Sequence, residues 1–96
     1  MDYKQIQIDN FFRYLAVPSQ SNAKAQSLPS TQGQYDLALL LKKELEDLGL
    51  SDIVLEDNAI LSGKLKGNAN KKSIGFCAHL DTVDVGLSEV IKPQIL

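Results

Sequence analysis

The stretch "SIGFCAHLDTVD", residues 73–84, decides how the fold of this chain is interpreted. Residues 74–80 are apolar almost throughout, without the alternation of a half-exposed strand, and such a run is typical of a central strand covered on both faces. The run ends at His79, the only histidine of the chain, and at Asp81 two positions later. We therefore predict a buried strand over 74–80 that brings a polar pair to its carboxyl end.

Two amphipathic helices are expected before this strand. Apolar residues at positions i, i+3, i+4 and i+7 predict a helix over residues 3–16, which ends before Pro18. Residues 18–33 are small and polar and are expected to form a loop, and long ordered loops are often functional. A leucine stripe predicts a second helix over 31–48, with Ser30 as its N-cap.

The end of the second helix and the segment after it carry clear signals. Gly49 is placed to end the helix in a Schellman motif, with Leu50 able to contact Leu45. Residues 52–56 and 59–66 then read as two short strands, joined by a tight two-residue turn at 57–58. We therefore expect a β-hairpin between the second helix and the central strand.

The order of helix, helix, strand, strand and strand predicts an α/β fold. Two helices cannot cover both faces of a sheet with a fully apolar strand, so residues 1–96 are expected to be part of a larger domain. Apolar residues of the tail would then fold back over the open face or pair with another copy, and we predict self-association. These tail residues are Val90, Ile91, Ile95 and Leu96.

Composition excludes several classes of function. The chain has 44% hydrophobic and 23% charged residues with a formal net charge of −2, so no basic excess indicates binding to nucleic acid or to an anionic membrane. Its apolar runs are too short to span a bilayer. The single cysteine cannot form an internal disulfide, which fits a reducing cytoplasm.

The polar pair at the end of the strand suggests a metal site. Alternate residues of a strand share a face, so His79 and Asp81 lie on the same side, about 6–7 Å apart along the strand. At that spacing the carboxylate can reach the imidazole if Asp81 bends back. A metal-binding histidine commonly donates its second ring nitrogen to a carboxylate. Ligands also collect at the carboxyl edge of open α/β sheets.

Simpler interpretations of these residues remain open. A lone histidine at a strand end is usually a half-exposed polar residue, and the spacing of His79 and Asp81 also occurs by chance. Cys77 is either a third ligand or small core filler, and burial of free cysteine favours filler. Asp84 is either a ligand or, more in keeping with its loop, a turn residue. The sequence contains neither a Gly-x-Ser-x-Gly elbow nor a phosphate-binding loop.

Three segments together resemble a known family. They are "LPSTQGQ" at 28–34, "IGFCAHLDT" at 74–82 and "KPQIL" at 92–96. In order and spacing they are similar to the amino-terminal part of the peptidase T family of tripeptide aminopeptidases. That family lies within the di-zinc metallopeptidases, which include carboxypeptidase G and the desuccinylases. The resemblance covers the whole chain and implies that residues 1–96 are the amino-terminal portion of a catalytic domain.

The resemblance implies roles for the polar pair. His79 stands where the family has a zinc-binding histidine, and Asp81 stands where it has the catalytic aspartate that holds this imidazole and tunes the metal. Family members use two zinc ions, with a bridging carboxylate, a glutamate general base, further acidic ligands and a second histidine that all lie beyond the position of Leu96. The chain departs from the family after Thr82, where it lacks the usual proline–aspartate pair. Alone, it is expected to be inactive on tripeptides and to bind zinc weakly at most.

Two other functions remain as alternatives. The chain could be a non-catalytic α/β module that binds a partner through its uncovered sheet. It could also be part of another di-zinc amidohydrolase or dipeptidase, although the segments at 28–34 and 92–96 favour peptidase T.

Overall fold

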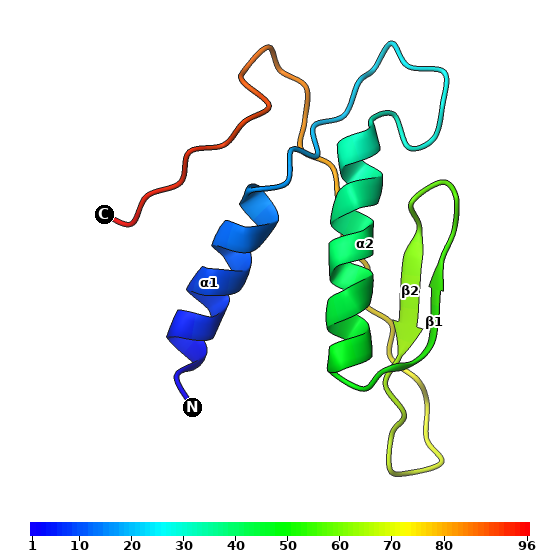
Figure 1. The fold of residues 1–96 in the computed structure, drawn as a ribbon. Helices are drawn as coiled ribbons and strands as arrows, with labels where there is room; N and C mark the ends of the chain where they lie inside the picture. Colours follow the sequence, from blue (N-terminus) through cyan, green and yellow to red (C-terminus); the bar gives the residue numbers. More distant parts are fainter.

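The computed structural model describes residues 1–96 and contains two helices and a two-stranded antiparallel sheet (Figure 1). This architecture confirms the predicted α/β class, both helices and the hairpin. Neither helix has the length and apolar content that crossing a membrane requires. The elements in chain order are α1 (Tyr3–Leu15), α2 (Gln32–Asp47), β1 (Ser51–Leu55) and β2 (Leu61–Lys64).

The carboxyl end of α2 forms the predicted Schellman motif. The N–H of Leu50 donates to the carbonyl of Leu45 (3.1 Å), and the N–H of Gly49 donates to that of Glu46 (3.0 Å). Gly49 has a φ of 82°, which glycine adopts without steric cost. A methyl group on Gly63 of β2 would lie 3.3 Å from Leu50 and 3.4 Å from Leu45, so both leucines converge on the hairpin. The motif therefore directs the chain from α2 into the sheet.

The amino end of α2 differs from the prediction by one residue. The N-cap is Thr31 and not Ser30, and the hydroxyl groups of both residues bond to the preceding loop. The Oγ of Ser30 accepts from the N–H of Asn22 (3.0 Å), and Oγ1 of Thr31 donates to the carbonyl of Gln20 (2.8 Å). Neither hydroxyl caps the helix, so the polar side chains at this end of α2 bind the loop before it.

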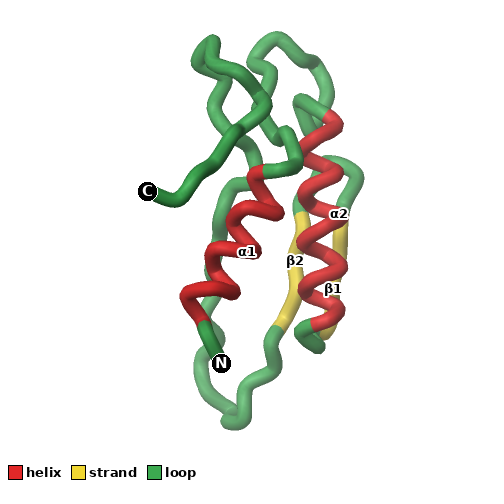
Figure 2. Tube along the Cα trace, turned by 60° about the vertical axis from the view of Figure 1, so that its left-hand side comes forward, coloured by secondary structure: helices red, strands yellow, loops and turns green.

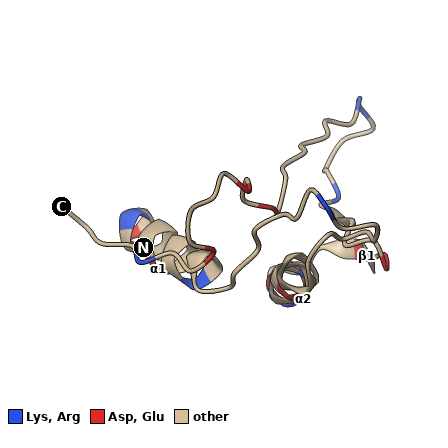
Figure 3. Ribbon diagram, turned by 90° about the horizontal axis from the view of Figure 1, so that it is seen from above, with Lys and Arg blue, Asp and Glu red and all other residues tan.

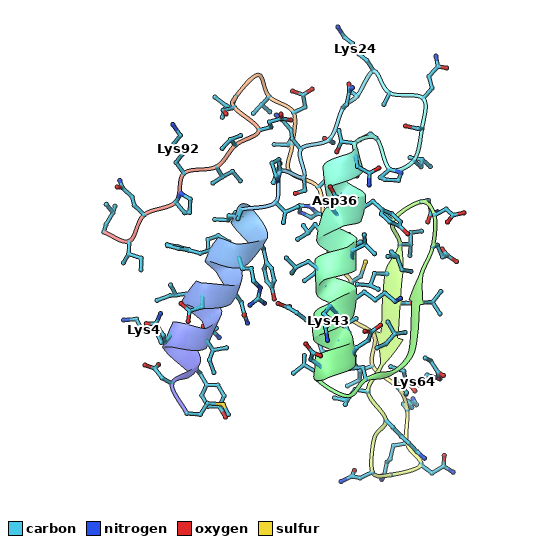
Figure 4. All side chains as sticks on the ribbon, in the orientation of Figure 1. Lys4, Lys24, Asp36, Lys43, Lys64 and Lys92 are labelled. Carbon is cyan, nitrogen blue, oxygen red and sulfur yellow. The ribbon has the colours of Figure 1, made fainter.

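Helix α1 lies beside α2 (Figures 1 and 3). Side chains near the carboxyl end of α1 contact α2. The hydroxyl of Tyr14 donates to Oε2 of Glu44 (2.6 Å), and Arg13 pairs with the same carboxylate. No residue of α1 is buried, and Phe11 remains 57% exposed. Within α2, the hydrogen bond and charge of Asp47 raise the pKa of Lys43, which is labelled in Figure 4.

The hairpin turn has three residues and not the predicted two. The N–H of Ala59 donates to the carbonyl of Glu56, and the N–H of Glu56 donates to the carbonyl of Ile60, each at 2.9 Å. Ala59 has a φ of 67°, in the left-handed region. This is the pattern of a type I turn followed by a left-handed residue. The residues at 57–58 lack the glycine that favours a two-residue turn. A third turn residue, the left-handed Ala59, therefore brings the chain back alongside β1.

The left-handed conformation of Ala59 predicts a stabilising substitution. We expect Ala59→Gly to raise the free energy of unfolding by about 0.5–1 kcal/mol, because glycine removes the Cβ penalty of a positive φ at some entropic cost. Urea unfolding followed by circular dichroism measures the change, and Ala69→Gly in the exposed connection is the control. A loss of stability in Ala59→Gly equal to that of the control would show that Ala59 is not left-handed.

The predicted strand over residues 74–80 is not formed. These residues carry no ladder hydrogen bonds and are drawn as loop in Figure 2. A groove of about 610 Å³ lies between residues 76–81 on one side and the hairpin turn with Leu41 and Leu45 on the other. Paired strands lie about 4.8 Å apart, so a segment across such a groove has no partner. Apolar sequence alone therefore did not produce a strand here.

Several residues expected in the core are consequently exposed. Ile74 is 81% and Phe76 is 96% exposed, and Cys77 is exposed as well, so the prediction of Cys77 as buried filler is wrong. The tail over residues 90–96 does not cover the sheet, because it extends on the side of α1 (Figure 1) and Leu96 is fully exposed. The physical reason is the same in each case, since no second layer is present to bury them.

The accessible surface shows how much of the chain is uncovered. It measures 8118 Å², whereas a folded monomer of 10.5 kDa is expected to expose about 5,400 Å². Three residues are buried: Ser19 in the loop after α1, and Leu37 and Ala38 in α2. The best-packed part of the chain is therefore made by this loop and the amino half of α2.

The exposed apolar surface leads us to expect self-association. Contiguous apolar patches on a soluble chain tend to be covered by another surface. Light scattering coupled to size exclusion should give a mass above 10.5 kDa that rises with concentration. Phe76→Ser should lower this mass, and Leu28→Ser, which changes an exposed leucine of the 18–31 loop, should not. A monomer at every concentration would contradict the expectation.

Candidate functional site

His79 and Asp81 lie together, as their spacing in the sequence predicts. Nδ1 of His79 is 2.8 Å from the main-chain carbonyl oxygen of Asp81 and 3.3 Å from its Oδ1. A carbonyl oxygen only accepts hydrogen bonds, so Nδ1 must carry the proton. The neutral ring then has its lone pair on Nε2. The side chain of His79 is 84% exposed, which leaves this ring open to an incoming ligand.

The partner atom differs from the one expected. The sequence predicts that the carboxylate of Asp81 holds the imidazole, whereas the main-chain carbonyl of the same residue is nearer. Residues separated by two positions allow the ring to turn back onto the backbone. The carboxylate stays beside the ring with its side chain 41% exposed. The backbone thus fixes the tautomer, and the carboxylate adds negative charge next to the ring.

Thr82, directly after the pair, is held by the loop that follows α1. The N–H of Thr82 donates to the carbonyl of Ser19 (3.1 Å), and the N–H of Ser21 donates to the carbonyl of Thr82 (2.8 Å). The hydroxyl of Ser21 also donates to this carbonyl (3.2 Å). These bonds make an isolated parallel bridge centred on Gln20 and Thr82. The candidate site is therefore attached to residues about sixty positions earlier.

The same loop is fixed to the first turn of α2. The hydroxyl of Thr31 donates to Gln20, and Ser19 is only 5% exposed. A methyl group on Gly33 would overlap the carbonyl oxygen of Pro18. Periodicity and spacing assigned Thr31 and Gly33 no functional role, although both lie in the 28–34 segment that carries the family resemblance. The available signal was Gly33 itself, because glycine is a poor helix former in a first turn where alanine would serve.

The other candidate residues are not brought to the pair. Cys77 and Asp84 are both exposed, and neither has a hydrogen bond to His79. No group of three histidine, cysteine, aspartate or glutamate side chains is placed to hold a metal ion. The chain offers a single imidazole nitrogen, whereas a catalytic zinc takes about three protein ligands. His79 thus fits one position of such a site.

Comparison with known proteins gives a consistent group of relatives. The chain is 51% identical over 90 residues to a peptidase T-like protein of Rhizobium meliloti and 51% identical over 89 residues to one of Yersinia pestis. It is 38% identical over 97 residues to peptidase T of Bacillus cereus. These matches cover 93%, 92% and 99% of this chain. No model of a known protein family matches it.

The names of the relatives agree on a class of protein and, within it, on one type. By name they are peptidases, so the sequence is similar to that of a peptidase. More particularly, the chain resembles peptidase T along nearly its whole length, and the match falls on the amino-terminal part of those proteins. The chain spans less than a quarter of their length, between 22% and 24%.

Proposed function

We propose that this chain forms the amino-terminal portion of the catalytic domain of a zinc-dependent tripeptide aminopeptidase of the peptidase T type. In this proposal His79 is a zinc ligand and Asp81 is the catalytic residue that holds its imidazole. The observation that carries it is the bond from Nδ1 of His79 to Asp81, because it leaves Nε2 as the nitrogen able to ligate. The lone cysteine suits a reducing cytoplasm for the enzyme.

The residues of the chain would act on the metal through the imidazole. Zinc, when bound, supplies a Lewis acid that activates water and polarises the scissile carbonyl. The carbonyl of Asp81 holds the proton on Nδ1 and so keeps the ring in the ligating tautomer. The carboxylate of Asp81, with Oδ1 3.3 Å from Nδ1, adds negative charge beside the ring and helps to orient it. The chain would contribute these two groups, and further ligands and a general base would come from elsewhere.

Activity provides the first test of this proposal. The isolated chain should not hydrolyse tripeptides with or without zinc, because one ligand and no general base are present. Grafted in place of the matching segment of Bacillus cereus peptidase T, residues 1–96 should support zinc-dependent tripeptide hydrolysis. In that graft His79→Ala should lower kcat by about 100-fold or more, since it removes a ligand and the loss of a residue that only orients a ligand already costs about 10–100-fold. The control is Asp84→Asn, which should leave kcat unchanged.

Two outcomes would contradict the activity prediction. One is zinc-dependent turnover by the isolated chain in a preparation free of other peptidases. The other is a graft in which His79→Ala retains full activity, because His79 could then not be a ligand. An active graft that cleaves dipeptides or amides and not tripeptides would favour another di-zinc hydrolase.

Zinc affinity of the chain provides a second prediction. Calorimetric titration should detect weak binding that His79→Ala abolishes. Asp81→Asn should weaken it by about tenfold or less, at the low end for residues that orient a ligand, because the main-chain bond to Nδ1 survives the substitution. Asp84→Asn is the matched control and should bind as the unaltered chain does. Tight binding that persists in His79→Ala would place the ligand elsewhere.

A second candidate function is a non-catalytic module that binds a partner. The exposure of Ile74 and Phe76 and the apolar lining of the groove beside residues 76–81 favour it. An inactive graft that still folds and assembles would support this alternative over the enzyme.

A further inference from the structure

We propose that the first turn of α2 contains two positioning residues, Thr31 and Gly33, for the imidazole of His79. They act through the loop over residues 18–22 and through the peptide unit that joins Asp81 to Thr82. The proposal rests on the function proposed above for His79 and names the residues that orient it.

The first step is that α2 begins with two departures from ordinary helix chemistry. A threonine at the N-cap normally accepts a hydrogen bond from a helix N–H, but the hydroxyl of Thr31 donates to Gln20. Glycine is disfavoured inside a helix, yet Gly33 lies in the first turn. Both departures weaken the helix locally, and natural sequences tend to concentrate such departures at functional sites.

The second step is that both departures serve the same contact. The backbone of the loop approaches α2 so closely that a methyl group on Gly33 would meet the carbonyl carbon of Pro18 at 2.8 Å and the Cα of Ser19 at 3.5 Å. Gly33 has no positive φ, so the space and not the backbone conformation requires glycine. Thr31 fixes the next part of the loop through the carbonyl of Gln20. The first turn of α2 therefore sets where Ser19 lies.

The third step carries the position of Ser19 to the imidazole. The carbonyl of Asp81 and the N–H of Thr82 belong to one planar trans peptide unit and point in opposite directions. The N–H donates to the carbonyl of Ser19 (3.1 Å), and the carbonyl accepts from Nδ1 of His79 (2.8 Å). Because the unit is planar, the bond to Ser19 determines the direction in which this carbonyl points. If Ser19 moves, the carbonyl of Asp81 should turn away from Nδ1 and should no longer favour the tautomer that carries the proton on Nδ1.

The tautomer of His79 is the direct test, and the chain has no other histidine to obscure it. Nitrogen NMR of the labelled 96-residue chain, at about pH 8.5 where an imidazole is neutral, distinguishes a proton on Nδ1 from one on Nε2. The unaltered chain should carry it on Nδ1. Gly33→Ala and Thr31→Val should both raise the fraction of rings with the proton on Nε2, because only the carboxylate of Asp81, 3.3 Å away, then remains to favour a proton on Nδ1.

Controls separate positioning from general damage. Gly67→Ala, where an added methyl group meets nothing within 4 Å, and Thr31→Ser, which keeps the hydroxyl, should both retain the tautomer of the unaltered chain. If Gly33→Ala unfolds the chain, as its amide spectrum would reveal, the comparison of Thr31→Val with Thr31→Ser decides alone. Thr31→Val removes no helix cap, because Thr31 makes none.

Two results would overturn the proposal. One is a proton on Nε2 in the unaltered chain, and the other is a proton that stays on Nδ1 in a folded Thr31→Val. The measurement needs neither metal nor peptide, so a failure of the proposed peptidase function would leave its outcome unchanged.

Discussion

The peptide unit between Asp81 and Thr82 is hydrogen-bonded on both sides, and the geometry of the candidate site depends on it. On one side its N–H meets Ser19, and on the other its carbonyl meets the imidazole of His79. Ser19 is in turn one of the three buried residues of the chain, with Leu37 and Ala38 of α2. The best-packed region and the candidate site are therefore two ends of a single set of contacts.

This arrangement explains how a sparsely packed chain can still define a local geometry. Most apolar side chains remain accessible, and α1 contributes no buried residue. Hydrogen bonds between backbone groups do not require a large core, and buried polar groups are costly to leave unpaired. The bridge between residues 19–21 and Thr82 pairs four backbone groups at once: the N–H and the carbonyl of Thr82, the carbonyl of Ser19 and the N–H of Ser21. The first turn of α2 thus fixes the position of the loop, and the loop fixes the position of the segment that follows residue 80.

The sequence predicted the elements that depend on local signals. The leucine stripe and Gly49 defined α2 and its Schellman end, and the spacing of His79 and Asp81 predicted their proximity. The strand over 74–80 failed because an apolar run becomes a strand only beside a partner strand, and none lies next to it. The bond to the main-chain carbonyl of Asp81 was also missed, since periodicity describes side chains and not the direction of a peptide unit.

The long-range contacts were beyond sequence reasoning for a different reason. Ser21 and Thr82 are 61 residues apart, and no periodicity or turn signal relates them. Only Gly33 gave a local indication, as a glycine placed where a helix would favour another residue. The resemblance to peptidase T identified the His79 segment and the 28–34 segment separately. The structure adds that the two are connected through Gln20 and Thr82.

Amide hydrogen exchange tests this connection most directly, because each amide reports its own hydrogen bond. The amides of Thr82 and Ser21 should be protected to an extent similar to those in the middle of α2. The amides of Phe76 and Cys77, which make no backbone hydrogen bond, should exchange at unprotected rates. Exchange of Thr82 as fast as that of Phe76 would contradict the claim that the loop after α1 holds the candidate site.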